Sequence, residues 1–101
     1  MSKGVTVTLE MIFNPGACDA FCAALPEMLK ETASRPGFRN IRAVRHKDDQ
    51  NRVILIEQWD SEKHYQDYVA WRTERGDFEN LGSAVKSMQM NFWPKEIASI
   101  L

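Results

Sequence analysis

The stretch 52–75 constrains the fold more than the rest of the sequence, because its hydrophobic period changes within a few residues. Residues 53–56 form an unbroken aliphatic run, which is typical of a strand buried on both faces. After Trp59, Asp60 and Ser61 are suited to capping a helix, and the apolar spacing becomes helical. A buried strand that passes directly into an amphipathic helix predicts a sheet with helices packed on it.

One face of the predicted helix 60–75 carries residues spaced at i, i+3, i+4 and i+7, namely Tyr65, Tyr68, Val69 and Arg72. If this helix folds back on the sheet, Trp59 and Tyr65 lie close together, either as core or as the wall of a cleft. A guanidinium on an apolar face is costly unless it is paired. Arg72 therefore either packs its stem and extends its head to solvent, or holds an anion.

The other elements follow from alternation and turn residues. The predicted elements are strands at 5–13, 38–47, 52–59 and 86–93, helices at 17–32 and 60–75, and a short helical turn at 77–81. Pro26 predicts a kink in the first helix or the start of a second one, and the apolar tail 95–101 is expected to lie against a surface. The order β-α-β-β-α-β predicts one α+β, ferredoxin-like domain over residues 1–101, with both helices on one face of an antiparallel sheet.

The register of the central hairpin decides which side chains share a face. A four-residue turn at 48–51 would place Arg42 opposite Glu57, Asn40 opposite Trp59 and Val44 opposite Leu55. Glu57 then either pairs with Arg42 or, without it, becomes a base in the cleft. The opposite face would carry Ile12, Ile41, Ala43, Ile54 and Ile56, an apolar surface that predicts a homodimer.

Composition excludes several classes of partner. The 101 residues have a formal net charge of -1 with interspersed signs, which argues against nucleic acid. No apolar run is long enough for a membrane span, and the start MSKGVTVTLE lacks a signal-peptide pattern, so we expect a cytoplasmic protein. Cys18 and Cys22, the only cysteines, are expected to be reduced and partly buried, and no residues have metal-site spacing.

The segment EQWDSEKHYQDY, residues 57–68, resembles the E-x-W-x-S-x-x-x-aromatic segment of the antibiotic biosynthesis monooxygenase family. The lead 36–38 into the second strand is also similar. The resemblance implies a dimeric α+β barrel. Trp59 and Tyr65 match the family's Trp and Tyr, whereas Leu55 occupies the Asn position. No Arg falls at the family's Arg position, near Glu79, although Arg72 and Arg75 are close in sequence. In the haem-degrading branch, the required Asn, Trp and His correspond to Leu9, Tyr68 and Phe78, so haem degradation is not expected.

The resemblance therefore implies a monooxygenase that oxidises a small hydroquinone-like or anthrone-like aromatic with molecular oxygen, without flavin, haem or metal. The expected catalytic residues are Trp59, Tyr65 and Arg72, and the expected substrate-binding residues are Leu55, Glu57, Tyr68, Asn40 and Leu9. Two alternatives stay open: a non-catalytic dimeric module that binds a small molecule, and a dimer whose cleft is filled by its own side chains.

Overall fold

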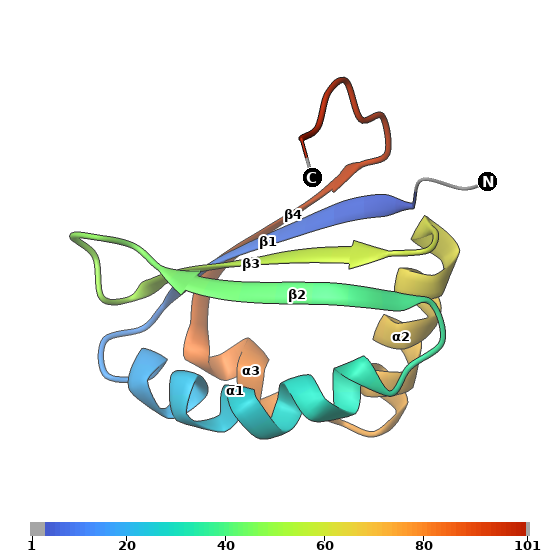
Figure 1. The fold of residues 1–101 in the computed structure, drawn as a ribbon. Coiled ribbons are helices and arrows are strands. Elements are labelled where there is room, and N and C mark those ends of the chain that lie inside the picture. Colours follow the sequence, from blue (N-terminus) through green and yellow to red (C-terminus); the bar gives the residue numbers. More distant parts are fainter. Residues whose placement is uncertain (1–3, 101) are drawn as a thin grey trace.

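The structure is a computed structural model that describes residues 4–100, and it contains one antiparallel sheet with helices on a single face (Figure 1). The elements are β1 (Val5–Phe13), α1 (Cys18–Ala33), β2 (Phe38–Arg45), β3 (Arg52–Trp59), α2 (Glu62–Glu74), α3 (Glu79–Ala84) and β4 (Val85–Trp93). The strand order β2-β3-β1-β4 confirms the ferredoxin-like prediction. Helix α1 continues through Pro26 without dividing, and α3 begins two residues later than the predicted helical turn.

The two central strands supply most of the core. In β1, every second residue from Val5 to Phe13 is buried, which confirms the predicted alternation. In β3 the buried positions are Val53, Leu55, Glu57 and Trp59, whereas Ile54 and Ile56 on the other face are only half-buried. The prediction that the aliphatic run is buried on both faces is therefore wrong within one chain, because helices cover only one side of the sheet.

The hairpin between β2 and β3 has a different register from the predicted one. The backbone N–H of His46 donates to the Arg52 carbonyl, so the loop contains five residues, 47–51, and not four. The His46 Nδ1 atom accepts the backbone N–H groups of Asp48 and Asp49, at 3.0 and 3.2 Å. These two bonds fold the loop around the imidazole, so Lys47 belongs to the loop and not to the strand. The result is a slip of one residue along β2.

This slip moves the β2 side chains from Asn40 onward to the opposite face, whereas Phe38, before the irregularity in the strand, pairs with Trp59. Ile41 pairs with Glu57, and Ala43 pairs with Leu55, so both lie on the helix side and not on the open side. Arg42 instead pairs with Ile56, and the predicted Arg42–Glu57 ion pair is not formed. The apolar residues on the open face of the sheet are then Ile12, Ile54, Ile56, the exposed Val44 and, at the end of β4, Trp93.

The C-terminal tail does not lie against a surface as predicted. Residues 94–100 form neither helix nor strand and leave the end of β4 on the side away from the helices (Figure 1). Ile97 and Ile100 are 99% and 95% exposed. Leu101, which the same prediction included, lies outside the described residues.

Candidate functional site

A narrow cavity of about 50 Å³ lies between the helix-covered face of the sheet and helices α1 and α2. Leu9 and Leu55 contribute apolar side chains from the central strands, and α1 contributes several more. The polar side chains on its wall are Thr32, Glu57, Tyr65 and Tyr68. A carboxyl and three hydroxyls therefore converge on an otherwise apolar space, which is the usual composition of a small-molecule site.

Glu57 is the one carboxylate on this wall, and only 3% of it is exposed. Its Oε1 atom accepts the indole N–H of Trp59 at 3.1 Å. Burial raises the pKa of Glu57 from 4.5 to about 7, and the bond from Trp59 opposes part of that rise. Among the described residues, Glu57 forms no ion pair, so its charge is compensated by one indole alone. Such a carboxyl can take up and release a proton near neutral pH.

Trp59 is fully buried and does not line the cavity. Its ring packs edge-on against Tyr65, with centroids 5.8 Å apart, and lies 5.0 Å from the ring of Tyr68. On the other side Phe38 contacts it edge-on at 5.4 Å. Trp59 thus holds the positions of both tyrosine rings and of the Glu57 carboxyl, and it does so from behind the wall of the cavity.

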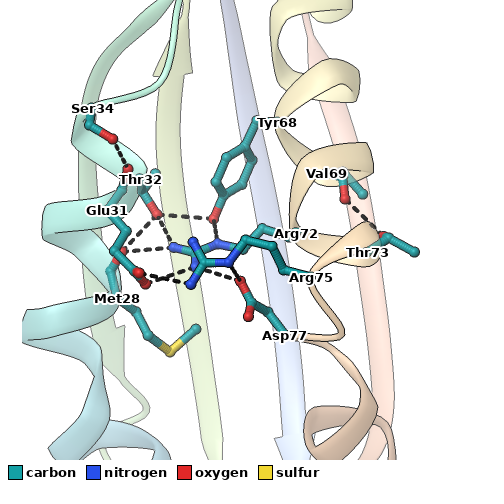
Figure 2. A network of polar contacts seen from close by, with 10 residues as sticks. All are labelled: Met28, Glu31, Thr32, Ser34, Tyr68, Val69, Arg72, Thr73, Arg75 and Asp77. Atoms are coloured by element: carbon teal, nitrogen blue, oxygen red, sulfur yellow. Dashed lines mark hydrogen bonds and ion pairs between the residues drawn. The ribbon is translucent and has the colours of Figure 1, made fainter.

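Arg72 is also behind the wall, where 1% of its side chain is exposed. Its Nη1 contacts carboxylate oxygens of Glu31, at 3.0 Å, and Asp77, at 2.9 Å (Figure 2). Its Nη2 donates to the Met28 carbonyl and to the Thr32 hydroxyl, at 2.8 and 3.0 Å. The remaining donor, Nε, reaches the Tyr68 hydroxyl at 3.0 Å. The five N–H groups of the guanidinium are thereby all used within the protein.

This network joins the end of α1 to the end of α2. Arg75 donates to Glu31 at 2.9 Å and contacts Asp77 at 3.4 Å, so two arginines share two carboxylates. The bonds from Arg72, and then those from Arg75, lower the pKa of Glu31. The alternative in which the Arg72 head extends to solvent is wrong, because the guanidinium is buried with a full set of acceptors.

The Tyr68 hydroxyl connects the network to the cavity. It lies 3.0 Å from the Thr32 hydroxyl and accepts from Arg72, and both Thr32 and Tyr68 line the cavity. The Tyr65 hydroxyl, in contrast, has no hydrogen-bond partner among residues 4–100. Burial, followed by the nearby Glu57, raises the pKa of Tyr65, so its phenol stays neutral.

A wider apolar groove of about 300 Å³ adjoins the cavity. Leu9, Tyr65, Phe78 and Leu81 line both spaces, and Met88 and Met90 of the edge strand β4 form the outer wall of the groove. Phe78 and Leu81 belong to the start of α3 and the residue before it. Side chains at the start of this short helix therefore lie between the small cavity, with its few polar groups, and the larger apolar groove.

The structure brings together five of the residues predicted for the site: Leu9, Leu55, Glu57, Tyr65 and Tyr68 line the cavity. Trp59 and Arg72 contact these residues from behind. Asn40 does not reach the cavity, because the slip in β2 turns it to the open face, where its amide donates to Gln58 at 3.1 Å. The predicted placement of Asn40 beside Trp59 is therefore wrong.

Sequence reasoning missed the contribution of α1 to the cavity. One face of α1 borders the cavity, and its residues there are Phe21, Leu25, Met28, Leu29 and Thr32. Their helical spacing shows that they share a face of α1, but nothing in the sequence shows that this face borders empty space. Glu31 and Asp77 were also missed as partners of Arg72, since they are 41 and 5 residues away along the chain.

The comparisons with known proteins agree with this fold. The family model for antibiotic biosynthesis monooxygenase matches residues 4–73. The chain belongs to this family. No curated protein sequence matches it.

Several solved structures share the fold. One is SnoaB, a cofactor-independent oxygenase from Streptomyces nogalater, with a TM-score of 0.79 and 17% identity over 93% of this chain and 94% of that one. Another is a conserved protein from Methanosarcina mazei, with a TM-score of 0.80 and 15% identity over 92% and 93% of the two chains. PA3566 from Pseudomonas aeruginosa has a TM-score of 0.77 and 16% identity over 95% and 97%. At these identities the likeness concerns the fold.

Residues 4–100 contain no group of three or more His, Cys, Asp or Glu side chains arranged to hold a metal ion. Within the same range, no helix has the length and apolar character that a membrane crossing requires. Cys18 and Cys22 are free thiols, buried and half-buried respectively, with their sulfur atoms 3.9 Å apart, as the sequence predicted.

Proposed function

We propose that this member of the family is a cofactor-independent monooxygenase that oxidises a small phenolic aromatic, hydroquinone-like or anthrone-like, with molecular oxygen. The observation that carries the proposal is Glu57: a buried carboxylate with a pKa of about 7, free of any ion pair in the described chain, on the wall of an apolar cavity. SnoaB, which has the same fold, is described as a cofactor-independent oxygenase. Family membership and this base support the same chemistry.

In the proposed reaction, Glu57 removes the proton of a phenol or of an anthrone. The resulting anion donates electrons to oxygen, and a bond forms between one oxygen atom and the carbon para to the anionic oxygen. Loss of water then leaves a para-quinone. Among hydroquinone-like substrates, the step requires a ring with a free carbon para to a hydroxyl. The balance is then one such phenol, or one anthrone, plus O₂, giving one quinone plus H₂O. The substrate supplies all four electrons, so the protein has to move a proton and stabilise an anion.

The size of the cavity sets a condition on this proposal. An apolar cavity of about 150 Å³ can hold benzene, and the volume next to Glu57 is about 50 Å³. A single ring therefore requires Phe78 and Leu81 to move outward, which would join the cavity to the adjoining groove of about 300 Å³. The reacting oxygen would then lie near Glu57, and the remainder of the ligand would lie between Tyr65 and the two methionines of β4.

The test is oxygen uptake with a panel of hydroquinones, naphthols and anthrones, without added flavin, nicotinamide or metal. We expect the parent protein to exceed the rate of autoxidation in buffer with at least one substrate. Glu57→Gln keeps the acceptor for Trp59 and removes the base, so turnover should fall by about 10² or more. Glu27→Gln is the matched control, because the side chain of Glu27 is 83% exposed on α1 and lies outside the cavity.

If the parent never exceeds autoxidation, the proposal is wrong, and saturable binding of the same compounds would favour the non-catalytic binding module. Loss of binding as well would favour a cleft filled by its own side chains. If Glu57→Gln retains full activity, the enzyme is real but Glu57 is not its base.

We further propose that the protein acts as a cytoplasmic homodimer formed through the open face of the sheet. Ile54 and Ile56 follow one another on that face of β3, Ile12 lies diagonally across from Ile54 on β1, and the exposed Val44, which pairs with Ile54, extends the patch onto β2. The Glu10–Arg52 ion pair between the same two strands contributes no net charge to that face. A face with this composition suits a second copy of itself.

A further inference from the structure

The polar network behind the cavity contains one hydrogen atom, on the Thr32 hydroxyl, that has two possible acceptors. Thr32 Oγ1 accepts from Arg72 and has a single hydrogen, which can go to the Met28 carbonyl or to the Tyr68 oxygen, both 3.0 Å away. If it goes to Met28, the Tyr68 hydroxyl donates back to Thr32. If it goes to Tyr68, the Tyr68 hydrogen is released for another acceptor.

The change between these two states leaves only the Tyr68 hydrogen without a partner in the network. The Met28 carbonyl also accepts Arg72 Nη2 at 2.8 Å, so it remains bonded when Thr32 turns away. Tyr68 then accepts from both Arg72 and Thr32, and its own hydrogen is directed elsewhere. Both Thr32 and Tyr68 border the cavity, so a hydrogen that leaves the network has this space beside it.

We infer that Tyr68 donates a hydrogen bond to an anionic oxygen bound in the cavity, and that Arg72 is a positioning residue which acts through Tyr68. The inference rests on the proposed use of the cavity as a phenol site. It replaces the sequence-based expectation that Arg72 contacts the anion itself, because the guanidinium has no donor left for a ligand. A hydroxyl that accepts from a cation is polarised and donates more strongly.

The ionisable groups that face the bound oxygen are few. Glu57 faces it from β3, and Tyr65 faces it from α2 beside Tyr68. Arg72, Arg75, Glu31 and Asp77 form the charged layer behind Tyr68. When a phenol passes its proton to Glu57, the negative charge moves from the carboxylate to the ligand oxygen. A donor on α2 is then placed to stabilise the charge in its new position.

The test uses 4-nitrophenol and 4-nitro-1-naphthol, whose phenolate forms absorb visible light, and measures the pKa of the bound probe by spectroscopic titration. A hydrogen bond to an anion changes the ratio of phenolate to phenol affinity by about tenfold or more, which is about one unit in the pKa of the probe. We expect the bound probe to have a lower pKa in the parent than in Tyr68→Phe and in Arg72→Met. The double variant should show no further change, because both residues act through one bond.

Arg75→Met is the matched control. Arg75 touches the same two carboxylates as Arg72 but does not contact Tyr68, so the pKa of the probe should equal that of the parent. If Arg72→Met does not fold, Tyr68→Phe, which leaves the two ion pairs of Arg72 intact, still tests the donor, and Arg72→Lys tests the positioning role.

Identical pKa values of the bound probe in the parent and in Tyr68→Phe would overturn the inference. So would the absence of measurable binding of either probe up to its limit of solubility. So would an equal change in Arg75→Met. The outcome is separate from that of oxygen uptake. A protein that binds the phenolate through Tyr68 without consuming oxygen refutes the proposed reaction alone, and an active enzyme with unchanged variants refutes this inference alone.

Discussion

Replacing Glu57 by glutamine should make the protein more stable above neutral pH. In the folded chain, burial raises the pKa of Glu57 from 4.5 to about 7, whereas the unfolded chain exposes it to water. Below pH 4.5 both states are protonated, and the group adds no pH dependence. Between pH 4.5 and 7 the folded state holds more of the proton, so the free energy of unfolding decreases as pH rises. Above pH 7 the loss is complete and constant.

The size of the effect follows from the same two pKa values. Their separation corresponds to about 3 kcal/mol of stability lost between about pH 4 and pH 8. The side chain is almost wholly buried, so solvent provides little screening. The amide introduced by Glu57→Gln would retain an oxygen acceptor for the Trp59 indole and has no charge to bury. The variant should therefore lack this decrease, while every other titrating group contributes equally to both proteins.

The assay is urea unfolding of parent and Glu57→Gln, followed by circular dichroism, at intervals from about pH 4 to pH 8. The informative quantity is the difference in the free energy of unfolding between the two proteins at each pH. We expect that difference to favour the variant increasingly from pH 4.5 and to level off above pH 7. A difference that stays flat across this range would show that Glu57 is solvated in the folded state and would remove the basis for its role as a base.

Four further outcomes are expected. If Glu57 is the base, the turnover rate should rise as pH passes through about 7, in the range where stability falls, and a rate independent of pH would contradict this assignment. Ile54→Glu should halve the mass measured by light scattering or unfold the protein, because it places an unpaired charge in the proposed interface; a parent that is monomeric at micromolar concentration would refute the dimer. Phe78→Ala should increase the affinity for two-ring phenols by enlarging the cavity, whereas Asn40→Ala, on the opposite face, should leave that affinity unchanged. Titration with haem should give no stoichiometric complex, and degradation of haem on adding a reductant would contradict the departures at Leu9, Tyr68 and Phe78.

The sequence was sufficient for the order of elements and for the buried side of most of them. Alternation in residues 5–13 and the i, i+3, i+4 spacing around Tyr65 and Tyr68 reflect burial directly, and burial is what a single sequence records best. The register of β2 could not be predicted from the sequence, because the loop length depends on how the His46 imidazole accepts two backbone N–H groups. One residue of difference was enough to separate Arg42 from Glu57.

The candidate site was predictable in part for a similar reason. Glu57 and Tyr65 were identified because the local sequence is enough to recognise a carboxylate in an aliphatic strand and an aromatic residue on a helix face. The role of Arg72 was not, because its acceptors come from α1, α2 and the segment before α3, and only the folded chain brings them together. Sequence position indicated that the guanidinium needed a partner, and the structure shows that its partners are all internal.

The bond between the Trp59 indole and Glu57 gives the protein an optical reporter of its own. Of the three tryptophans, Trp59 is fully buried, Trp71 stacks with the guanidinium groups of Arg35 and Arg75, and Trp93 is 58% exposed. Because the indole of Trp59 is buried, we expect it to emit at short wavelength, and we expect its emission to change when the carboxyl oxygen 3.1 Å from its nitrogen belongs to a charged group. Fluorescence at short wavelength would follow the ionisation of Glu57 in the resting protein, with no label, substrate or oxygen present.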